Sequence, residues 1–157
     1  MGAYSDPIDA DCAFCGIVAG REPASEVYRD DRVTAFLSTG PVTPGHLLVT
    51  PNAHLPSLAD VPEPLAAHLF VVGQRLAAAL RASGLRCEGI NLFLADGEAA
   101  FQEVFHAHLH VFARFAGDGF TLDSPTFAQA GPERAELDNN ANAIRSALAA
   151  VGGEESS

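Results

Sequence analysis

The sequence predicts an α+β fold in which an antiparallel sheet of about five strands packs with one long helix, and a C-terminal helix follows. The chain has 157 residues, enough for one compact domain with a sizeable core. Apolar residues make up 48% of the chain and charged residues 18%, which is typical of globular proteins. Strand-like segments lie on both sides of one long helical segment, and this order favours an antiparallel sheet.

Five segments are rich in β-branched, aromatic and aliphatic residues and are bounded by turn formers, which is typical of β-strands. They are residues 27–28, 32–37, 46–50, 89–95 and 104–112. Asp30-Asp31 is the expected hairpin turn between the first two segments. Pro51 should end the third, because proline cannot donate a hydrogen bond to a sheet. The turn-rich residues 39–45 should form a loop.

Two segments have the apolar spacing of helices. The first begins near Pro62 and ends before Gly84, a residue that commonly follows a helix. Its apolar residues, spaced three or four apart, are Leu65, Leu69, Val72, Leu76 and Leu80. This should be the long helix on the sheet. Leu137, Ile144 and Leu148 predict the C-terminal helix.

The net charge limits the possible partners. Nine basic and twenty acidic residues give a formal charge of −11, which opposes binding to polymeric nucleic acid and to anionic membranes. No stretch approaches the ~20 apolar residues of a membrane span. Residues 1–11 lack the basic flank and apolar run of a signal peptide. We therefore expect a cytoplasmic protein, for which a small nucleotide is still an allowed ligand.

The strongest functional signal is in residues 106–112, where His106, His108 and His110 alternate with apolar residues. On a strand this alternation places the three imidazoles on one face and the apolar side chains on the other. The rings could converge on a catalytic zinc ion or take separate roles. The outer two are ~13 Å apart on a strand and cannot converge without a bulge, so separate roles fit better.

This segment resembles the histidine triad (HIT) motif, in which His-x-His-x-His is followed by two apolar residues. Other segments agree with the family in the right order, namely residues 12–20, 35–37, 41–49 (its second signature) and 97–102 (the loop before the triad). The resemblance covers about residues 11–118 and implies a HIT-like fold for them. It leaves a flexible leader at 1–10 and an extension at 119–157 with a helix at about 132–151.

Proteins of this family are nucleotide hydrolases and transferases in which the middle histidine attacks the α-phosphorus, and water then cleaves the nucleotidyl-histidine. The resemblance implies that His108 is the nucleophile and that His110 hydrogen-bonds the phosphate oxygens. A backbone carbonyl near the second signature should hold the other nitrogen of His108, and His46 should lie beside the site.

The resemblance also implies a substrate pocket. Charge on the transition state would be met by His110, by backbone N–H groups near Gln102 and Glu103, and by Arg114 as a further candidate. The residues that match the base and ribose pocket are Phe14, Ile17, Phe36 and Thr39. Such apolar walls suit a purine, although Phe14 and Phe36 could equally be core residues.

Four residues depart from the family pattern. Ser38 stands where many members have the aspartate that holds the ribose hydroxyls, and Ala95 where an Asn or Gln would contact the phosphate. Phe101 replaces a glycine. Glu103 replaces a hydroxyl residue, which puts an acid near the anionic substrate. Each departure could narrow the substrate range or lower the activity.

Cys12 and Cys15 form a Cys-x-x-Cys pair, which by itself could be a metal site, a redox pair or a coincidence. Some family members complete such a pair with two histidines, which correspond here to His54 and His106. Two thiolates and two imidazoles would form a closed, tetrahedral, structural Zn²⁺ site. His46 competes with His54 as a ligand, and a thiol pair without metal is the alternative.

The resulting hypothesis is a homodimeric hydrolase that acts at the α-phosphate of a purine nucleotide derivative, either a nucleoside phosphoramidate or a dinucleoside polyphosphate. The dimer is implied by the family, whose members pair through the long helix and a strand. Two alternatives are a nucleotide-binding regulatory protein with weak or no turnover and a zinc-stabilised scaffold that binds anions. Outside these motifs, Cys87 should be structural and His68 should be exposed on the long helix.

Overall fold

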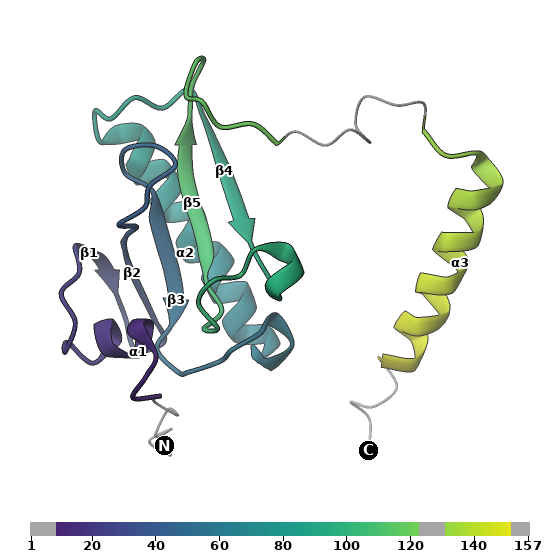
Figure 1. Cartoon of the computed structure of the whole chain (residues 1–157), viewed down its shortest axis with the longest axis horizontal. Helices are drawn as coiled ribbons and strands as arrows, with labels where there is room; N and C mark the ends of the chain where they lie inside the picture. The colour runs from purple at the N-terminus through teal and green to yellow at the C-terminus, as the bar shows by residue number, and fades with distance from the viewer. Residues whose placement is uncertain (1–8, 123–130, 152–157) are drawn as a thin grey trace. The chain divides into compact units, whose positions relative to one another are not determined.

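The computed structural model describes residues 9–122 and 131–151 (Figure 1). The chain divides into two compact units, one that ends at Gly119 and one that begins at Phe120. The sheet belongs to the first unit, and the C-terminal helix α3 (Arg134–Val151) belongs to the second. Of the leader expected at 1–10, only residues 9 and 10 lie within the described residues.

Five strands form one antiparallel sheet in the order β1-β2-β3-β5-β4. Their bounds are β1 Glu26–Arg29, β2 Val33–Leu37, β3 Leu47–Pro51, β4 Gly89–Leu94 and β5 Leu109–Arg114. Together with the long helix α2 (Glu63–Ala82) and with α3, the sheet confirms the predicted α+β fold. Pro51 is the last residue of β3 and so lies inside the strand that it was expected to follow.

Cross-strand pairing lines up a row of side chains on the face of the sheet that carries His110. In this row, Phe36 pairs with Leu48, Leu48 with His110, and His110 with Phe93, so that the row crosses β2, β3, β5 and β4. Cross-strand partners point to the same face of a sheet. His110 of the triad therefore lies on the same face of the sheet as Phe36 of β2 and Phe93 of β4.

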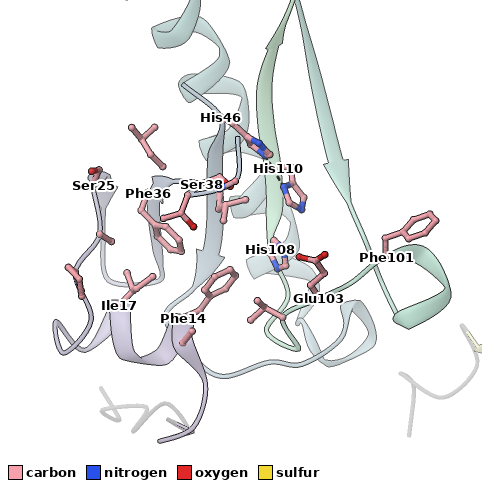
Figure 2. A pocket seen from close by; sticks show the side chains of 18 residues that line it. Phe14, Ile17, Ser25, Phe36, Ser38, His46, Phe101, Glu103, His108 and His110 are labelled. Carbon is pink, nitrogen blue, oxygen red and sulfur yellow. Dashed lines mark hydrogen bonds between the residues drawn. The ribbon is translucent and has the colours of Figure 1, made fainter. Parts of the chain in front are cut away.

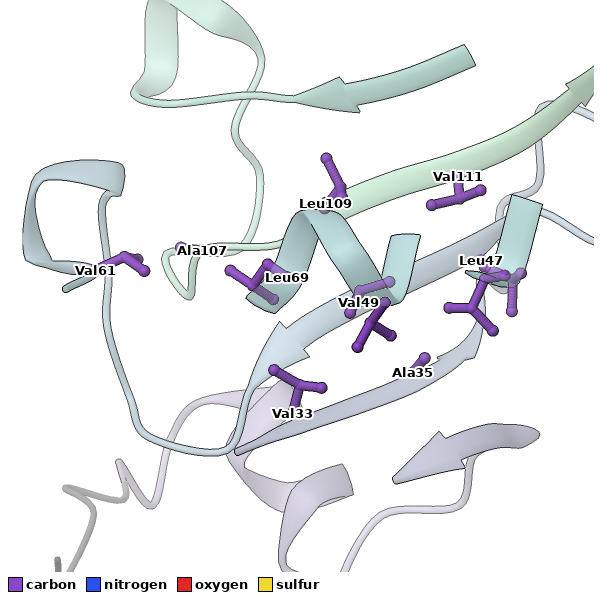
Figure 3. Close-up of a cluster of buried hydrophobic side chains, with 11 residues drawn as sticks. Val33, Ala35, Leu47, Val49, Val61, Leu69, Ala107, Leu109 and Val111 are labelled. Atoms are coloured by element: carbon purple, nitrogen blue, oxygen red, sulfur yellow. The ribbon is translucent and has the colours of Figure 1, made fainter. Parts of the chain in front are cut away.

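The opposite face of the sheet packs against α2 (Figure 3). Val33, Val49 and Val111 are fully buried there, with Val72 of α2. Burying each such side chain contributes ~1.5–3 kcal/mol relative to leaving it exposed. Four of the five apolar residues predicted for the core face of the helix are buried, and Leu65 is partly buried. This core holds the strands on which the triad face is built.

Close packing between α2 and β5 depends on Gly73. A Cβ atom at this position would lie 2.8 Å from Cδ2 of Leu109, closer than carbon atoms pack. Glycine lets the helix approach the strand that carries His110. The helix ends are also favourable, with Glu63 in the first turn and Arg81 in the last turn, where each charge complements the helix dipole.

The strand predicted at 104–112 was wrong at its start, because β5 begins only at Leu109. Before that residue the chain bends at residues 104–106 and is not part of the sheet ladder. The N–H of Ala107 donates to the carbonyl of Leu55 (2.7 Å), and the carbonyl of Ala107 accepts from the hydroxyl of Thr50 (3.2 Å). These bonds replace strand pairing, so two of the three triad histidines precede β5.

Three short helices complete the first unit. Helix α1 (Ala13–Val18) begins after Cys12, whose sulfur accepts the backbone N–H of Cys15 at 3.5 Å. The 3₁₀ helices are η1 (Leu58–Asp60) and η2 (Glu98–Ala100). Within the described part of the chain, no helix combines the length and the apolar character that a membrane crossing requires.

Candidate functional site

A pocket of about 930 Å³ lies on the face of the sheet that carries His110 (Figure 2). This volume is within the ~300–1,000 Å³ of small-molecule sites. Of the residues predicted for the site, those that line it are Phe14, Ile17, Phe36, Ser38, Thr39, His46, Glu103, His108 and His110. They come from α1, β2, the loop after β2 and the segment that leads into β5. The pocket therefore brings together segments far apart in the sequence.

The three triad histidines occupy two sites instead of converging on one. The rings of His108 and His110 are 4.8 Å apart between centroids, and both line the pocket. The ring of His106 is fully buried and lies 5.3 Å from that of His54. Ala107, between the two sites, belongs to the α2 core. His106 thus belongs to the Cys/His cluster, whereas His108 and His110 belong to the pocket.

A backbone carbonyl determines which ring nitrogen of His108 carries the proton. Nδ1 of His108 lies 2.7 Å from the carbonyl oxygen of His106, which can only accept. Nδ1 therefore carries the proton, and Nε2 has a free lone pair. The expected acceptor near the second signature was wrong for this residue. The carbonyl of Pro51, next to that segment, instead accepts from Nε2 of His106 at 2.8 Å.

The hydrogen bond with His46 determines which ring nitrogen of His110 carries the proton. The N–H of Val42 donates to Nδ1 of His46 at 3.1 Å, so the proton of neutral His46 is on Nε2. This Nε2 lies 2.9 Å from Nδ1 of His110, which must then accept. Neutral His110 consequently carries its proton on Nε2. The two pocket histidines have complementary nitrogens, a lone pair on His108 and an N–H donor on His110.

Burial keeps these histidines neutral at pH 7. Burial, together with the neighbouring His108 and His46, lowers the pKa of His110 to about 4. Burial also lowers the pKa of His46 and of His108, although the bond to the carbonyl of His106 opposes the shift for His108. A neutral imidazole with an available lone pair is a competent nucleophile. The geometry and the charge state therefore suit His108 for attack on an electrophile in the pocket.

One wall of the pocket is aromatic. The ring of Phe14 meets that of Phe36 edge to face, with centroids 5.3 Å apart, and the ring of His108 at 5.0 Å. Both phenylalanines are buried, in a small cluster with Leu48. They are thus core residues and pocket residues at once, so neither of the two interpretations of their role excludes the other.

Cys12, Cys15, His54 and His106 bring four donor atoms within 4.8 Å of one another. Nδ1 of His106 lies 3.5 Å from Sγ of Cys12 and 3.6 Å from Sγ of Cys15, and Nδ1 of His54 lies 3.4 Å from Sγ of Cys15. In a zinc tetrahedron with bonds of ~2.1–2.3 Å, donor atoms are roughly 3.4–3.8 Å apart. The cluster fits a structural zinc ion.

The hydrogen bonds around this cluster also suit a metal. Because Nε2 of His106 donates to Pro51, its Nδ1 offers a lone pair to the cluster. The carboxylate of Asp9 lies 3.7 Å from Nε2 of His54, on the side away from the sulfurs. This contact is longer than a hydrogen bond, but it places a carboxylate on the side of His54 where carboxylates commonly orient zinc-binding histidines. His46, the competing ligand, lies at His110 instead and is not part of the cluster.

Three of the residues that the sequence analysis singled out, Gln102, Arg114 and Ala95, are not among those that line the pocket. The side chain of Gln102 donates to the carbonyls of Pro56 (2.7 Å) and Val104 (3.1 Å), and its backbone N–H donates to Gly97. It therefore fixes the loop before the triad. Arg114 pairs with Asp118 at 2.6 Å, at the end of β5. Ala95 is buried.

His68 is not the exposed residue that we expected from its helical position. Its Nε2 lies 2.6 Å from Oδ2 of Asp30, in the turn between β1 and β2. Only 14% of its side-chain surface is exposed. Helix α2 brings these two residues together across 38 positions of sequence, a contact that local patterns cannot reveal.

Sequence reasoning missed several residues at or near the pocket. Phe93 does not line the pocket, but its ring lies 5.8 Å from that of His110, of which it is the cross-strand partner. Register pairing could have found it only with the strand order in hand. Phe101, which we noted as a departure from the family, does line the pocket. Leu48 and Val104 do so too, and their apolar character alone does not distinguish them from core residues.

Comparison with known protein families and structures agrees with this geometry. The model of the HIT domain matches residues 19–117. An uncharacterized HIT-like protein of Mycobacterium tuberculosis is 40% identical over 123 residues, which cover 78% of this chain and 85% of that protein. An adenylylsulfatase of Arabidopsis thaliana is 33% identical over 111 residues, covering 70% of this chain and 55% of that protein.

Among solved structures, the chain is similar to a zinc-bound histidine triad family protein of Mycobacterium smegmatis. The two have a TM-score of 0.68 and 40% sequence identity, and the match covers 92% of this chain and 97% of that one.

Proposed function

Because the chain belongs to the histidine triad (HIT) family, we propose that it hydrolyses a purine nucleotide derivative at the α-phosphate through a nucleotidyl-histidine on His108. The substrate would be a nucleoside phosphoramidate or a dinucleoside polyphosphate. Family membership supports nucleotide hydrolase or transferase activity in general. The observation that carries the finer proposal is the free lone pair on Nε2 of His108, which follows from its bond to the carbonyl of His106.

In the first step, a bond forms between Nε2 of His108 and the α-phosphorus, while the bond to the leaving group breaks. The electron pair of the broken bond goes to the leaving atom, which takes up a proton from solvent. In the second step, a water oxygen bonds to phosphorus and releases a proton to solvent, and the electron pair of the P–N bond returns to Nε2 of His108. The Nε2 proton of His110 donates to a phosphate oxygen in both steps, where negative charge increases.

The two ends of the nucleotide would bind in different parts of the pocket. Phe14, Ile17 and Phe36 offer a flat apolar surface for the purine. Ser38 and Thr39 lie nearby and offer hydroxyl groups to the ribose. The Ser38 hydroxyl oxygen already accepts the N–H of Gly40 at 3.2 Å, so it can replace only part of what an aspartate would supply. This favours weak ribose binding and is the reason to retain a low-turnover regulatory role as the second candidate.

We further propose that zinc is structural in this chain. Bound to Cys12, Cys15, His54 and His106, it would hold the start of α1 against the segment before β5. The four protein donors complete a tetrahedron and leave no position for a catalytic water. Thiolates that bind zinc are kept reduced in the cytoplasm, our proposed location.

A homodimer is part of the same proposal. Strand β4 is an edge of the described sheet and pairs there with β5 alone, so its other side can pair with a second copy. Phe93 on this strand is 41% exposed and Phe70 on α2 is 61% exposed, which offers apolar surface to such a contact.

The test is to incubate the protein with adenosine phosphoramidate and with diadenosine polyphosphates, and to quench early for mass spectrometry of the intact chain. We expect release of AMP and a transient adduct of one AMP on the wild type, with neither on His108→Asn. Equal, slow turnover by both proteins, with nucleotide still bound, would contradict the hydrolase and favour the regulatory role.

A further inference from the structure

Phe101 adopts a conformation that its own packing does not explain. Among the described residues it is the one non-glycine residue with a positive φ, +67°. A bulky side chain is disfavoured there by crowding at Cβ, and glycine would relieve the strain. The side chain is also 85% exposed, so the core gains nothing from it. A strained, exposed aromatic residue that lines a pocket is instead placed to contact what binds there.

Glu103, two residues later, brings a negative charge into the same part of the pocket. It is exposed and lines the pocket, and no described residue donates a hydrogen bond to its carboxylate or pairs with it. Figure 2 shows Glu103 beside His108 and Phe101 farther out on the same side, while Phe14, Ile17 and Phe36 lie on the other side. The pocket is thus apolar on one side of the nucleophile, and acidic and aromatic on the other.

The pocket contains no cationic residue to offset this acid. All nine basic residues of the chain are arginines, and none is among the residues that line the pocket. Arg29, Arg86 and Arg114 pair with Glu26, Glu88 and Asp118, which also lie outside the pocket lining. A polyphosphate on this side of His108 would meet a carboxylate and no cation.

We propose that Glu103 and Phe101 form a leaving-group subsite that selects a positively charged amine. The preferred substrate is then a nucleoside phosphoramidate whose amine carries a second, cationic group, such as an alkylammonium. The carboxylate attracts this cation, and the face of the phenylalanine ring contacts it. The same carboxylate repels the additional phosphates of a dinucleoside polyphosphate. The inference rests on the proposed function, because it requires hydrolysis through His108.

The experiment compares kcat/KM for three substrates on the full-length protein. They are an adenosine phosphoramidate of an alkylammonium-bearing amine, the matched phosphoramidate with a neutral alkyl chain, and diadenosine tetraphosphate. For the wild type we expect the cationic substrate to be preferred over the neutral one by about 10-fold, and the tetraphosphate to be poorest. The preference should weaken as salt is raised, because the carboxylate is exposed.

Two variants test the two residues separately. Glu103→Gln keeps the size of the side chain and should abolish the preference between the two phosphoramidates while raising kcat/KM for the tetraphosphate. Phe101→Gly removes the ring and suits the positive φ, so it should fold and should lower kcat/KM for the cationic substrate several-fold. The matched control is Glu98→Gln, which removes a charge from exposed η2 outside the pocket lining and should leave the ratios unchanged.

The outcomes separate the two levels of the proposal. If the wild type and Glu103→Gln hydrolyse both phosphoramidates in the same ratio, the leaving-group subsite is wrong while the hydrolase stands. The same holds if the tetraphosphate is the best substrate of the wild type. If no substrate is turned over faster than by His108→Asn, both proposals are overturned.

Discussion

Nε2 of His46 donates to Nδ1 of His110 across 2.9 Å, so the second pocket histidine receives its proton position from a residue outside the triad. His46 is buried, and its ring also lies 5.1 Å from that of Phe112. It has no lone pair left for a ligand, because its Nδ1 accepts from the N–H of Val42. His46 is therefore a positioning residue for His110.

Replacing His46 by leucine should remove this positioning without removing a group that touches the phosphate. We expect kcat to fall ~10–100-fold with little change in KM, as for other residues that orient an imidazole. His46→Gln retains an N–H donor and should recover part of the loss. Nitrogen NMR of His110 should show its Nε2-protonated form in the wild type and a mixture of tautomers in His46→Leu. An unchanged tautomer in the leucine variant would contradict the assignment.

The pH dependence of activity should reflect burial of the nucleophile. Because burial lowers the pKa of His108, its neutral form persists below the ordinary histidine value of about 6.5. We expect kcat/KM for a phosphoramidate to stay level from pH 8 to pH 6.5 and to fall only at lower pH. The background rate of hydrolysis is measured with His108→Asn at each pH and subtracted. An acid limb with its midpoint at or above pH 6.5 would show that the imidazole is not shielded from solvent.

Loss of one zinc ligand should release the metal and loosen α1. We expect Cys15→Ser to be purified without zinc and to melt roughly 10 °C below the wild type, since metal binding contributes to folding. Zinc content is measured by elemental analysis and melting by calorimetry. Cys87→Ser is the matched control, because this thiol donates to the carbonyl of Gly89 and lies outside the cluster. Stoichiometric zinc in Cys15→Ser would exclude the assigned ligand set.

The Asp30–His68 contact should stabilise the fold at neutral pH. Burial alone would raise the pKa of Asp30, but hydrogen bonds from two backbone N–H groups, His68 and Tyr28 outweigh it and lower the pKa. An acid with a lowered pKa contributes stability above its unfolded value of about 3.9 and loses it as the pH falls further. We expect Asp30→Asn to lower the free energy of unfolding at pH 7 by ~1–3 kcal/mol.

The control for this contact is Asp31→Asn, which alters the neighbouring residue, 90% exposed at its side chain. Its unfolding free energy should change by less than about 0.5 kcal/mol. Urea denaturation at pH 7 and at pH 3 measures both variants. The difference between wild type and Asp30→Asn should shrink at pH 3, and a difference that grows there would refute the contribution of the carboxylate.

The sequence was informative wherever the answer depended on local alternation. Residues 106–112 predicted that Ala107, Leu109 and Val111 face the core and that the histidines between them do not. They did not predict the start of β5, since that depends on bonds from Ala107 to Leu55 and Thr50. The family resemblance assigned His54 to the metal site, with His46 as the competing ligand. The structure agrees with that assignment, because the fold places His54 in the cluster and His46 at His110.

The departures from the family pattern were visible in the sequence, but their meaning was not. Glu103 was noticed as an acid near an anionic substrate, and Phe101 as a replacement for glycine. Only the structure shows that both lie on one side of His108, and that the residues lining the pocket include no arginine. Relative placement of this kind depends on the loop before the triad, which Gln102 holds through three hydrogen bonds.

Phe14 stands between the two histidine sites, with its ring 6.0 Å from that of His106 and 5.0 Å from that of His108. The next residue along α1 is Cys15, a member of the metal cluster. One six-residue helix therefore supplies both a wall of the pocket and a residue of the metal cluster. Phe36 and Leu48 form one buried cluster with Phe14, and Cys12 packs against that cluster, so a substitution on these strands would also be transmitted to the metal cluster.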